Sequence, residues 1–402
     1  MSWENRNFKE LGFLGRGKSR HRPRNDESLY GGDYPMIQTG DVKAANFYLN
    51  SFSQTYNDKG LAQSKLWNPN TLCITIAANI AETAILGMKA CFPDSIIGFI
   101  ADEEKSDVRF IKYFFDIYKE RMQRISQGAT QDNLSLEKLL TFEVPTPPLQ
   151  TQKRIADILS AYDDLIENNL KRINLLEQAA QNIHKEWFVN LRFPGHEDTP
   201  INEETGLPVG WGEKEISSII TFLGGYAFKS KTYIEIGKYR VITIKNVGDK
   251  VFNTSVGNSV DSIPDKMKEH CKIIEGDILL SLTGNVGRSC IAYGENNLLN
   301  QRVAKIVPTN KNWLPYIYWM FNDNKMFSLM NNLATGAAQQ NLSPVKLAKE
   351  KVVIPSESII ELYCSKAKSV FKQIILLNKQ NQKLKAARDI LLPRLMDRTI
   401  EV

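Results

Sequence analysis

The sequence predicts an α+β protein in which two duplicated globular domains are separated by two long antiparallel coiled-coil helices. Two observations support this prediction: the chain of 402 residues repeats itself once, and each repeat changes character near its end. The first part of each repeat holds short β-branched runs, whereas the last part has apolar residues at alternating steps of three and four. The halves are therefore expected to be related by a pseudo-two-fold axis.

The internal repeat is clearest in two segments of twelve residues. Residues 128–139 read GATQDNLSLEKL and residues 336–347 read GAAQQNLSPVKL, which gives eight identities. The same offset pairs Trp3 with Trp211, and further matches keep the same order along the chain. We therefore predict five parts: an N-terminal domain over 1–146, a first long helix over 147–192, a linker over 193–210, a second domain over 211–355, and a second long helix with its tail over 356–402.

Each globular part is predicted to contain several strands and one helix. Apolar runs punctuated by Gly, Asn and Asp predict strands at residues 74–76, 97–100, 241–244 and 278–282. Helical patterns cover residues 109–125 in the first copy and 313–332 in the second. This mixture predicts an α+β domain of ordinary size in each copy.

The long helices are predicted to begin after Pro148 and after Pro355, each over roughly 38 residues. A capping box formed by Ser358 and Glu361 is expected at the start of the second helix, and Pro393 is expected to end it. Neither helix can bury its apolar stripe alone, so the two stripes are predicted to pack on each other. The predicted packing residues are Ile155, Leu159, Tyr162, Ile166, Ile173, Leu176 and Ile183 in the first helix, and Ile374, Leu377, Leu384 and Leu391 in the second.

Composition excludes several classes of protein. The chain is 42% hydrophobic and 24% charged, which is too apolar for a disordered protein, yet no run approaches the length of a membrane span. Five widely spaced cysteines without a CxxC pair indicate reduced thiols and a cytoplasmic location. Four histidines make a His-rich metal centre an unattractive hypothesis. The net charge of +6 permits a polyanionic partner without requiring one.

The segment Gly12–Ser19 fits the G-x-x-x-x-G-K-S pattern of a phosphate-binding loop. That motif needs a buried strand before it and a helix after it, and the flanking residues favour neither. The matching segment of the second copy, residues 222–230, lacks the pattern. We therefore interpret Gly12–Ser19 as a look-alike and predict no nucleotide site there.

A basic cluster in the first copy is the main candidate for DNA contact, because Lys and Arg suit phosphates and Arg also suits guanine. A solvated loop remains the alternative. The cluster has no acid within it and consists of Arg16, Lys18, Arg20, Arg22 and Arg24. The second copy places basic and aromatic residues at the matching position: Tyr226, Phe228, Lys229 and Lys231.

Further polar candidates come from other matched segments. Amides at Gln131, Asn133, Gln339, Gln340 and Asn341 can read adenine or cap a turn, and turn formation remains the stronger alternative. A polar loop after a predicted strand contributes Thr283, Asn285 and Arg288, with Asn79 as a counterpart in the first copy. The repeat-matched segments 37–42 and 242–247 add Gln38, Thr39, Lys245 and Asn246.

Motifs of catalysis are missing from the sequence. There is no HExxH segment, no nucleophile elbow, and no glycine-rich cofactor loop followed by the Asn-Pro-Pro-aromatic tetrapeptide of amino-methyltransferases. Asn68-Pro69-Asn70-Thr71 lacks the second proline and the aromatic residue. We therefore predict that the chain has no catalytic residues and binds no metal.

Three segments together resemble a known family. They are Pro147-Pro-Leu-Gln-Thr-Gln-Lys-Arg-Ile-Ala-Asp-Ile-Leu, Leu207-Pro-Val-Gly-Trp and Gly276-Asp-Ile-Leu-Leu-Ser-Leu-Thr-Gly. With the order of domain, long helix, domain and long helix, they resemble the specificity subunit of type I restriction–modification systems. The resemblance covers nearly the whole chain.

This resemblance implies that each globular domain reads one half of a bipartite site in double-stranded DNA. The helices would set the gap between the half-sites and dock two modification subunits, which bind S-adenosylmethionine and methylate adenine at N6. Up to two restriction subunits would add ATP and Mg²⁺. The chain itself would bind no cofactor, would not contact a membrane, and would work in bacterial or archaeal cytoplasm.

Two other functions stay open at this point. An ATP-using enzyme with its site at Gly12–Ser19 would bind nucleotide as an isolated chain. A coiled-coil adaptor with two protein-binding heads would show no salt-dependent DNA affinity even when its partners are bound.

Overall fold

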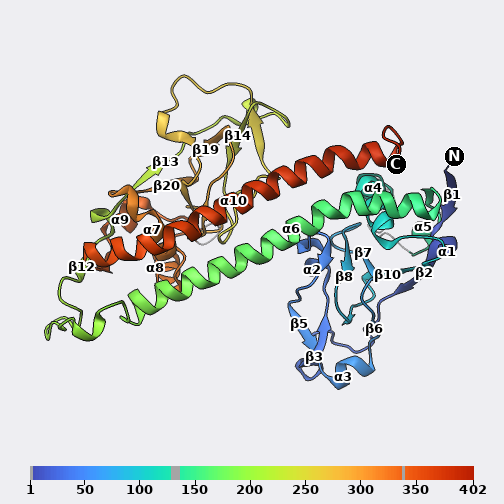
Figure 1. Ribbon diagram of the computed structural model, residues 1–402, viewed down its shortest axis with the longest axis horizontal. Coiled ribbons are helices and arrows are strands. Elements are labelled where there is room, and N and C mark those ends of the chain that lie inside the picture. Colours follow the sequence, from blue (N-terminus) through green and yellow to red (C-terminus); the bar gives the residue numbers. More distant parts are fainter. Residues whose placement is uncertain (1–2, 128–135, 337–339) are drawn as a thin grey trace. The chain divides into compact units, whose positions relative to one another are not determined.

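The computed structural model describes residues 3–127, 136–336 and 340–402 (Figure 1). It divides into two compact units: residues 1–168 with 381–402 form unit 1, and residues 169–380 form unit 2. Each long helix therefore contributes one part to each unit. The predicted domain boundaries treat the helices as separate parts, and they remain a prediction.

Among its described residues, unit 1 holds three sheets and several helices. The paired strands β1 (Glu4–Asn7) and β11 (Glu143–Thr146) form the smallest sheet. The five-stranded sheet has the order β2 (Gly12–Arg16), β10 (Ile96–Ala101), β7 (Leu72–Thr75), β8 (Thr83–Leu86), β4 (Tyr48–Leu49). The four-stranded sheet has the order β5 (Gln54–Tyr56), β3 (Tyr30–Met36), β9 (Ala90–Cys91), β6 (Leu66–Trp67). The α-helices here are α1 (Phe8–Leu11), α2 (Thr39–Ala44), α3 (Asp58–Ala62), α4 (Val108–Gln127) and α5 (Leu136–Leu139).

Unit 2 repeats this plan. Strands β12 (Gly212–Glu215) and β21 (Lys351–Ile354) pair with each other. One four-stranded sheet has the order β13 (Ile220–Gly224), β20 (Val303–Pro308), β17 (Ile278–Ser281), β18 (Ser289–Ile291). The other has the order β15 (Asn258–Val260), β14 (Tyr239–Ile242), β19 (Asn297–Leu299), β16 (Lys272–Ile273). The short α-helices are α7 (Leu314–Phe321), α8 (Asn324–Leu333) and α9 (Pro344–Lys349).

The strand orders of the two units correspond one to one. The order β5-β3-β9-β6 matches β15-β14-β19-β16, and in both sheets the central pair, β3 with β9 and β14 with β19, is parallel. The order β2-β10-β7-β8 matches β13-β20-β17-β18, and unit 1 adds β4 at the edge. The internal duplication predicted from the sequence is therefore confirmed at the level of topology.

Two long helices complete the fold, α6 (Leu149–His184) and α10 (Glu357–Met396) (Figure 1). In unit 1, Asp163 of α6 bonds Arg388 of α10. In unit 2, the Tyr363 hydroxyl on α10 donates to the Ala180 carbonyl on α6 over 3.4 Å. Residue numbers on α10 fall as those on α6 rise, which is the order of an antiparallel pair.

Each unit buries apolar residues from both long helices in its hydrophobic core. In unit 1, Ile155 and Leu159 of α6 and Leu395 of α10 are buried in the cluster that contains Phe8 and Phe99. In unit 2, residues from both helices enter the cluster built around the aromatic residues of α7. Burial of the predicted stripe is what holds the helices to the domains.

The seam of α6 differs from the prediction at one position. Ile183 is 43% exposed, whereas His184 is 5% exposed and packs against aromatic rings. The seam advances four residues from Ala180 to His184 and then three to Trp187. With this spacing, the indole ring of Trp187 lies in the same buried stripe as Ala180 and His184.

Three predicted helix ends were wrong. The single helix over 313–332 is broken into α7 and α8, because the Asp323 carboxylate accepts the Lys325 N–H and caps a new helix. Helix α10 begins at Glu357, so Ser358 lies inside it and forms no capping box. Pro393 lies inside the last turn of α10, where the neighbouring Leu395 is buried and offsets the lost hydrogen bond.

Candidate nucleic-acid interface

Four segments of unit 2 meet at one end of the sheet β13-β20-β17-β18, and backbone hydrogen bonds join them. We call them the unit 2 loop junction: residues 225–229, 282–288, 300–302 and 340–342. The Leu282 N–H donates to the Arg302 carbonyl over 3.0 Å, and the Gly284 N–H donates to the Gln340 carbonyl over 3.1 Å. The Gln301 N–H reaches the Tyr226 carbonyl over 3.0 Å. The structure therefore brings together three of the segments that the sequence analysis had singled out separately.

Most polar side chains of this junction point to solvent. Among the residues that the structure describes, seven of them are exposed and make no side-chain hydrogen bond or ion pair: Lys229, Asn285, Arg288, Gln301, Arg302, Gln340 and Asn341. Exposed amides and guanidinium groups on loops are the groups that contact phosphates and base edges. Because no protein bond has to break, these side chains are available to a ligand.

The remaining predicted residues of the second copy divide into exposed and packed ones. Lys229, Lys231 and Lys245 are exposed. Tyr226 and Phe228 are half-buried, with ring centroids 5.1 Å apart in an edge-to-face arrangement. Their rings therefore support the loop in this structure and present little free surface.

Asn246 and Thr283, two predicted contacts of unit 2, both take part in bonds within the unit. Asn246 is fully buried, and its amide donates to the Asn253 and Val256 carbonyls over 2.9 and 2.7 Å. Its side-chain oxygen accepts the Thr243 N–H over 2.8 Å, so Asn246 closes a loop and is withdrawn as a DNA contact. Thr283 is half-buried and pairs with Asn341 through a backbone bridge.

Unit 1 contains a corresponding junction, which we call the unit 1 loop junction: residues 16–18, 75–82 and 92–96. The Lys18 N–H donates to the Phe92 carbonyl, and the Ile76 N–H donates to the Ser95 carbonyl, both over 2.9 Å. The candidates Gln131 and Asn133 of this copy, and Gln339 of the other, lie outside the described residues.

The basic cluster of unit 1 is only partly free. Arg16 and Arg20 are exposed, and their side chains make no bond among the described residues. Lys18 is half-buried, and Arg22 donates to the Ser19 and His21 carbonyls. Nη2 of Arg24 donates to both carboxylate oxygens of Asp94, over 2.7 and 3.0 Å. Arg24 therefore has an acidic partner from outside the cluster, so it is not free.

Other candidates of the first copy contribute to loop structure. Gln38 precedes α2, where its N–H donates to the Asp41 carboxylate over 2.7 Å, and Thr39 is the first residue of that helix. The Asn79 side chain accepts a hydrogen bond from Lys43 Nζ over 3.0 Å. These residues are engaged within unit 1, so the structure favours a local structural role for them.

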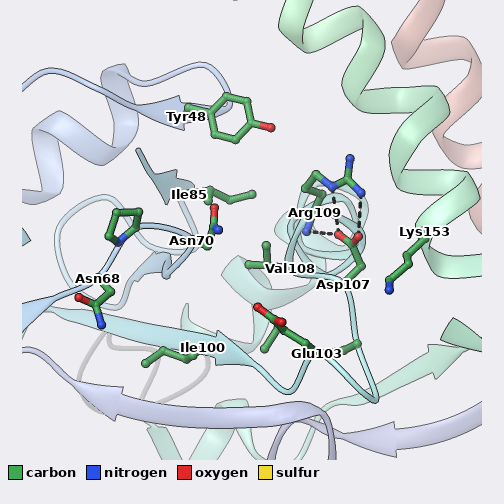
Figure 2. A pocket seen from close by; sticks show the side chains of 13 residues that line it. Tyr48, Asn68, Asn70, Ile85, Ile100, Glu103, Asp107, Val108, Arg109 and Lys153 are labelled. Atoms are coloured by element: carbon green, nitrogen blue, oxygen red, sulfur yellow. Dashed lines mark hydrogen bonds and ion pairs between the residues drawn. The ribbon is translucent and has the colours of Figure 1, made fainter. Parts of the chain in front are cut away.

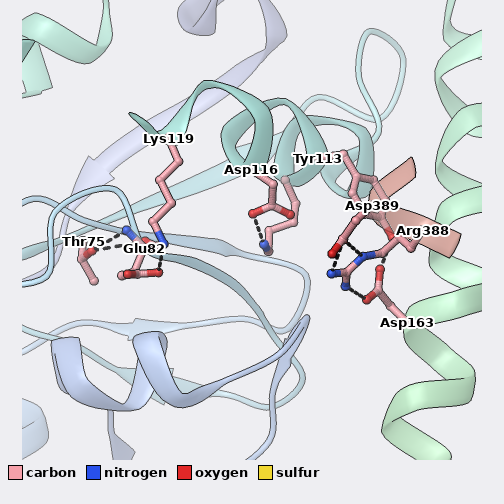
Figure 3. Close-up of polar contacts among 9 residues, drawn as sticks. Thr75, Glu82, Tyr113, Asp116, Lys119, Asp163, Arg388 and Asp389 are labelled. Atoms are coloured by element: carbon pink, nitrogen blue, oxygen red, sulfur yellow. Dashed lines mark hydrogen bonds and ion pairs between the residues drawn. The ribbon is translucent and has the colours of Figure 1, made fainter. Parts of the chain in front are cut away.

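The loop over residues 75–82 is held from two sides (Figure 3). The Thr75 hydroxyl bonds the Asn79 carbonyl and accepts the Glu82 N–H over 3.0 Å. The Glu82 carboxylate pairs with Lys119 of α4 over 2.7 Å. In unit 1 this loop is therefore closed by Glu82, whose charge is neutralised by Lys119 of α4.

A hollow of about 480 Å³, lined by polar and apolar side chains, lies beside the start of α4 (Figure 2). Its central cation, Arg109, pairs with Asp107 at 2.8 Å and with Asp157 at 2.9 Å. The bonds to Asp107 raise the pKa of this guanidinium. Two carboxylates therefore hold Arg109 at the start of α4.

The segment Gly12–Ser19 does not have the structure of a phosphate-binding loop. Residues Gly12–Arg16 form strand β2, which pairs along its length with β10. No helix follows, because residues 17–26 form bends and turns. The segment therefore lacks the strand–loop–helix context that the motif needs, and its interpretation as a look-alike stays a prediction.

Comparison with protein families decides the assignment. The family model described as type I restriction modification DNA specificity domain matches residues 1–178 and 208–386. The chain belongs to this specificity family. The two matched ranges coincide with the two copies of the internal repeat, so each copy carries its own specificity domain.

Relatives and a solved structure agree with this assignment. The chain is 24% identical over 416 residues to the type I restriction enzyme MjaIX specificity subunit of Methanocaldococcus jannaschii, covering 98% of this chain and 92% of that protein. The HindI specificity subunit of Haemophilus influenzae is 22% identical over 332 residues, covering 68% and 72%. The S subunit of the type I restriction–modification system from M. genitalium has the same fold, with a TM-score of 0.58, 18% identity, and coverage of 98% and 96%.

Within this specificity-family chain, two exposed residues of the unit 2 loop junction were missed by sequence reasoning. Gln301 and Arg302 carry no motif, and Asn300 alone separates them from the buried strand β19. Only tertiary contacts distinguish them: the Arg302 carbonyl accepts the Leu282 N–H, and the Gln301 N–H donates to the Tyr226 carbonyl. In the described part of the chain, no cluster of three metal-ligating side chains occurs, and no helix has the length and hydropathy of a membrane span.

Proposed function

We propose that this chain reads a bipartite site in double-stranded DNA, with the loops of unit 1 on one half-site and those of unit 2 on the other. One observation carries the proposal: the two units share the backbone plan of a loop junction but present different side chains on it. A shared frame with different side chains is suited to reading two different sequences in the same way.

Two classes of contact divide the work at each junction. Exposed cations such as Arg16 and Arg20 bind phosphates and position the unit on the duplex. The amides and guanidinium groups of the unit 2 loop junction read base edges, since bidentate donors and acceptors distinguish base pairs in the major groove. Contacts to phosphates carry no sequence information, so the half-site sequence depends on the second class.

We assign the spacing of the half-sites and the docking of two modification subunits to the long helices. Helices of 36 and 40 residues are roughly 54 and 60 Å long at 1.5 Å per residue. Such helices are stiff when each packs an apolar stripe against its partner. Base pairs in the gap are then spanned without being read.

In this proposal the chain performs no chemistry. The modification subunits supply S-adenosylmethionine and methylate adenine at N6, and up to two restriction subunits supply ATP and Mg²⁺. The side chains of the loop junctions select the site at which those partners act.

Co-expression with the modification subunit encoded beside this chain, followed by mapping of methylated bases in genomic DNA, tests the proposal. The expected result is adenine methylation at one bipartite motif with a fixed gap, and its loss when this chain is deleted. Exchange of residues 1–146 for those of another specificity subunit is expected to change one half-site only. A stable complex that methylates no such motif would support the coiled-coil adaptor instead.

A further inference from the structure

The turn before β20 in unit 2 is the structural counterpart of the turn before β10 in unit 1. The Val303 N–H donates to the Asn300 carbonyl over 2.9 Å, and the Ile96 N–H donates to the Pro93 carbonyl over 3.0 Å. Each is a tight turn of four residues with two residues at its tip.

The adjacent loops fix which tip residues correspond. In unit 2 the Arg302 carbonyl accepts the Leu282 N–H over 3.0 Å, and in unit 1 the Ser95 carbonyl accepts the Ile76 N–H over 2.9 Å. Arg302 therefore stands where unit 1 has Ser95. Gln301 likewise stands where unit 1 has Asp94.

A glycine holds each turn close to the neighbouring strand end. A Cβ atom on Gly225 would lie 2.3 Å from the Asn300 carbonyl oxygen, and one on Gly17 would lie 2.2 Å from the Pro93 carbonyl oxygen. Such an approach is possible only without a side chain. Each turn therefore packs closely against the backbone of the neighbouring glycine segment. The side chains at the tip of each turn are held by a rigid backbone.

At one equivalent loop position the charge is reversed between the units. Arg288 closes the loop of unit 2 through a 2.9 Å bond from the Ser281 N–H to its carbonyl, and Glu82 closes the loop of unit 1 through the matching 3.0 Å bond from Thr75. Glu82 is neutralised by Lys119, whereas Arg288 has no partner among the described residues.

The turn tips differ in charge as well, at neighbouring positions: unit 1 has Asp94 where unit 2 has Gln301, and unit 2 has Arg302 where unit 1 has Ser95. Asp94 of unit 1 is neutralised by Arg24 at 2.7 Å. Arg302 of unit 2 is exposed, and its guanidinium makes no bond within the described chain. The unit 2 loop junction therefore presents unpaired guanidinium groups on two adjoining loops, where unit 1 presents neutralised acids.

We propose that Arg302 reads a guanine in the half-site of unit 2, with its guanidinium donating to O6 and N7 of that base. This inference rests on the proposed function and deepens it. Arginine forms this bidentate contact in the major groove more readily than any other residue. The rigid turn lowers the entropy lost on binding, and the serine at the equivalent place gives unit 1 a different preference.

The test uses the complete complex with its modification subunits. Methylation rates are measured on duplexes that carry the wild-type motif and on a series with each base pair of the second half-site replaced. With the Arg302→Ala chain, discrimination is expected to fall by about 10- to 100-fold at one G·C position and to stay unchanged elsewhere. The first half-site, read by unit 1, serves as the internal check that the complex has folded and assembled.

Two further variants separate base reading from charge. Arg302→Lys keeps the positive charge but lacks the planar guanidinium group. We therefore expect that this variant does not restore the G·C preference. Lys325→Ala removes an exposed cation of α8 in the same unit and is expected to change no preference.

The outcomes separate this inference from the proposed function. Uniform weakening on all duplexes, restored by Arg302→Lys, would identify a phosphate contact and overturn the assignment. Unchanged discrimination in Arg302→Ala would overturn it as well. If the wild-type complex methylates no bipartite motif, the proposed function fails together with this inference, and that result is visible before any variant is compared.

Discussion

Asp163 of α6 and Arg388 of α10 form a buried ion pair in unit 1 across a sequence separation of 225 residues (Figure 3). The Asp163 side chain is 1% exposed and also accepts a hydrogen bond from the Tyr113 hydroxyl of α4 over 2.5 Å. Burial raises the pKa of Asp163, while Arg388 and Tyr113 act in the opposite direction. Three helices therefore meet at one carboxylate, which favours a single register of the helix pair in this unit.

Arg388→Ala is expected to destabilise unit 1 by about 3–5 kcal/mol, because it leaves the Asp163 charge buried without its guanidinium partner. Hydrogen exchange of the α4 amides at increasing urea concentration measures this change within the intact chain. Arg394→Ala removes an exposed cation from the same helix and is the matched control, with an expected change of about 0.5 kcal/mol or less. Equal effects of the two variants would contradict the importance of the buried pair.

His184 is expected to make unit 2 less stable in acid. Burial lowers the pKa of this imidazole from 6.5 to about 4. The unfolded chain therefore takes up a proton that the folded chain rejects, so stability that is complete above pH 6.5 falls as the pH approaches 4. The expected loss at pH 5 is about 2 kcal/mol.

Urea unfolding of unit 2 at pH 7 and pH 5 measures this loss, and His184→Phe is expected to remove it. Glu177 lies two turns earlier on α6, and burial raises its pKa to about 7. Protonation of this carboxyl stabilises the fold as the pH falls, which opposes the effect of His184. Both chains are therefore compared in a Glu177→Gln background, where an unchanged pH profile after His184→Phe would refute the assignment.

Gly225→Ala is expected to displace the turn at Asn300, because the new Cβ would lie 2.3 Å from a backbone oxygen. Overpacking of this kind costs about 1–3 kcal/mol. Methylation at the second half-site is expected to fall while the first half-site is still read. Gly224→Ala is the matched control, since no atom lies within 4 Å of a Cβ there. A control as damaging as Gly225→Ala would show that backbone freedom, and not the close approach, matters.

Replacement of Arg16 and Arg20 by Gln is expected to weaken DNA binding by the assembled complex on all sequences. If both contact phosphates, the slope of log affinity against log salt concentration falls by about 2. Titration of a labelled duplex over a range of salt concentrations measures the slope. Lys9→Gln with Arg121→Gln removes two exposed cations elsewhere on unit 1. A slope changed equally by both pairs would indicate a nonspecific effect of net charge.

Local patterns predicted most of the fold. The runs at 74–76 and 278–282 became strands β7 and β17, and the apolar stripe of the long helices is buried in both units. Helix ends were less predictable, since Asp323 starts a helix inside a continuous apolar pattern. At Ile183 the period alone did not determine which of two adjacent residues faces the core.

The candidate site was predictable only in part. Arg288, Gln340 and Asn341 are exposed as a reading surface requires, but Asn246 is buried and Arg24 is paired. Nothing local distinguishes a free arginine from a paired one, because Asp94 lies far along the chain from Arg24.

By itself, the sequence determined the duplication, the α+β class and the two long helices, because repeats and hydrophobic periods are properties of neighbouring residues. Tertiary structure alone decided which polar side chains are free. Arg302 and residue 282 adjoin only because two strands place their ends together, and Asp163 meets Arg388 only because two helices run antiparallel. Contacts across such separations depend on packing geometry, which no local pattern records.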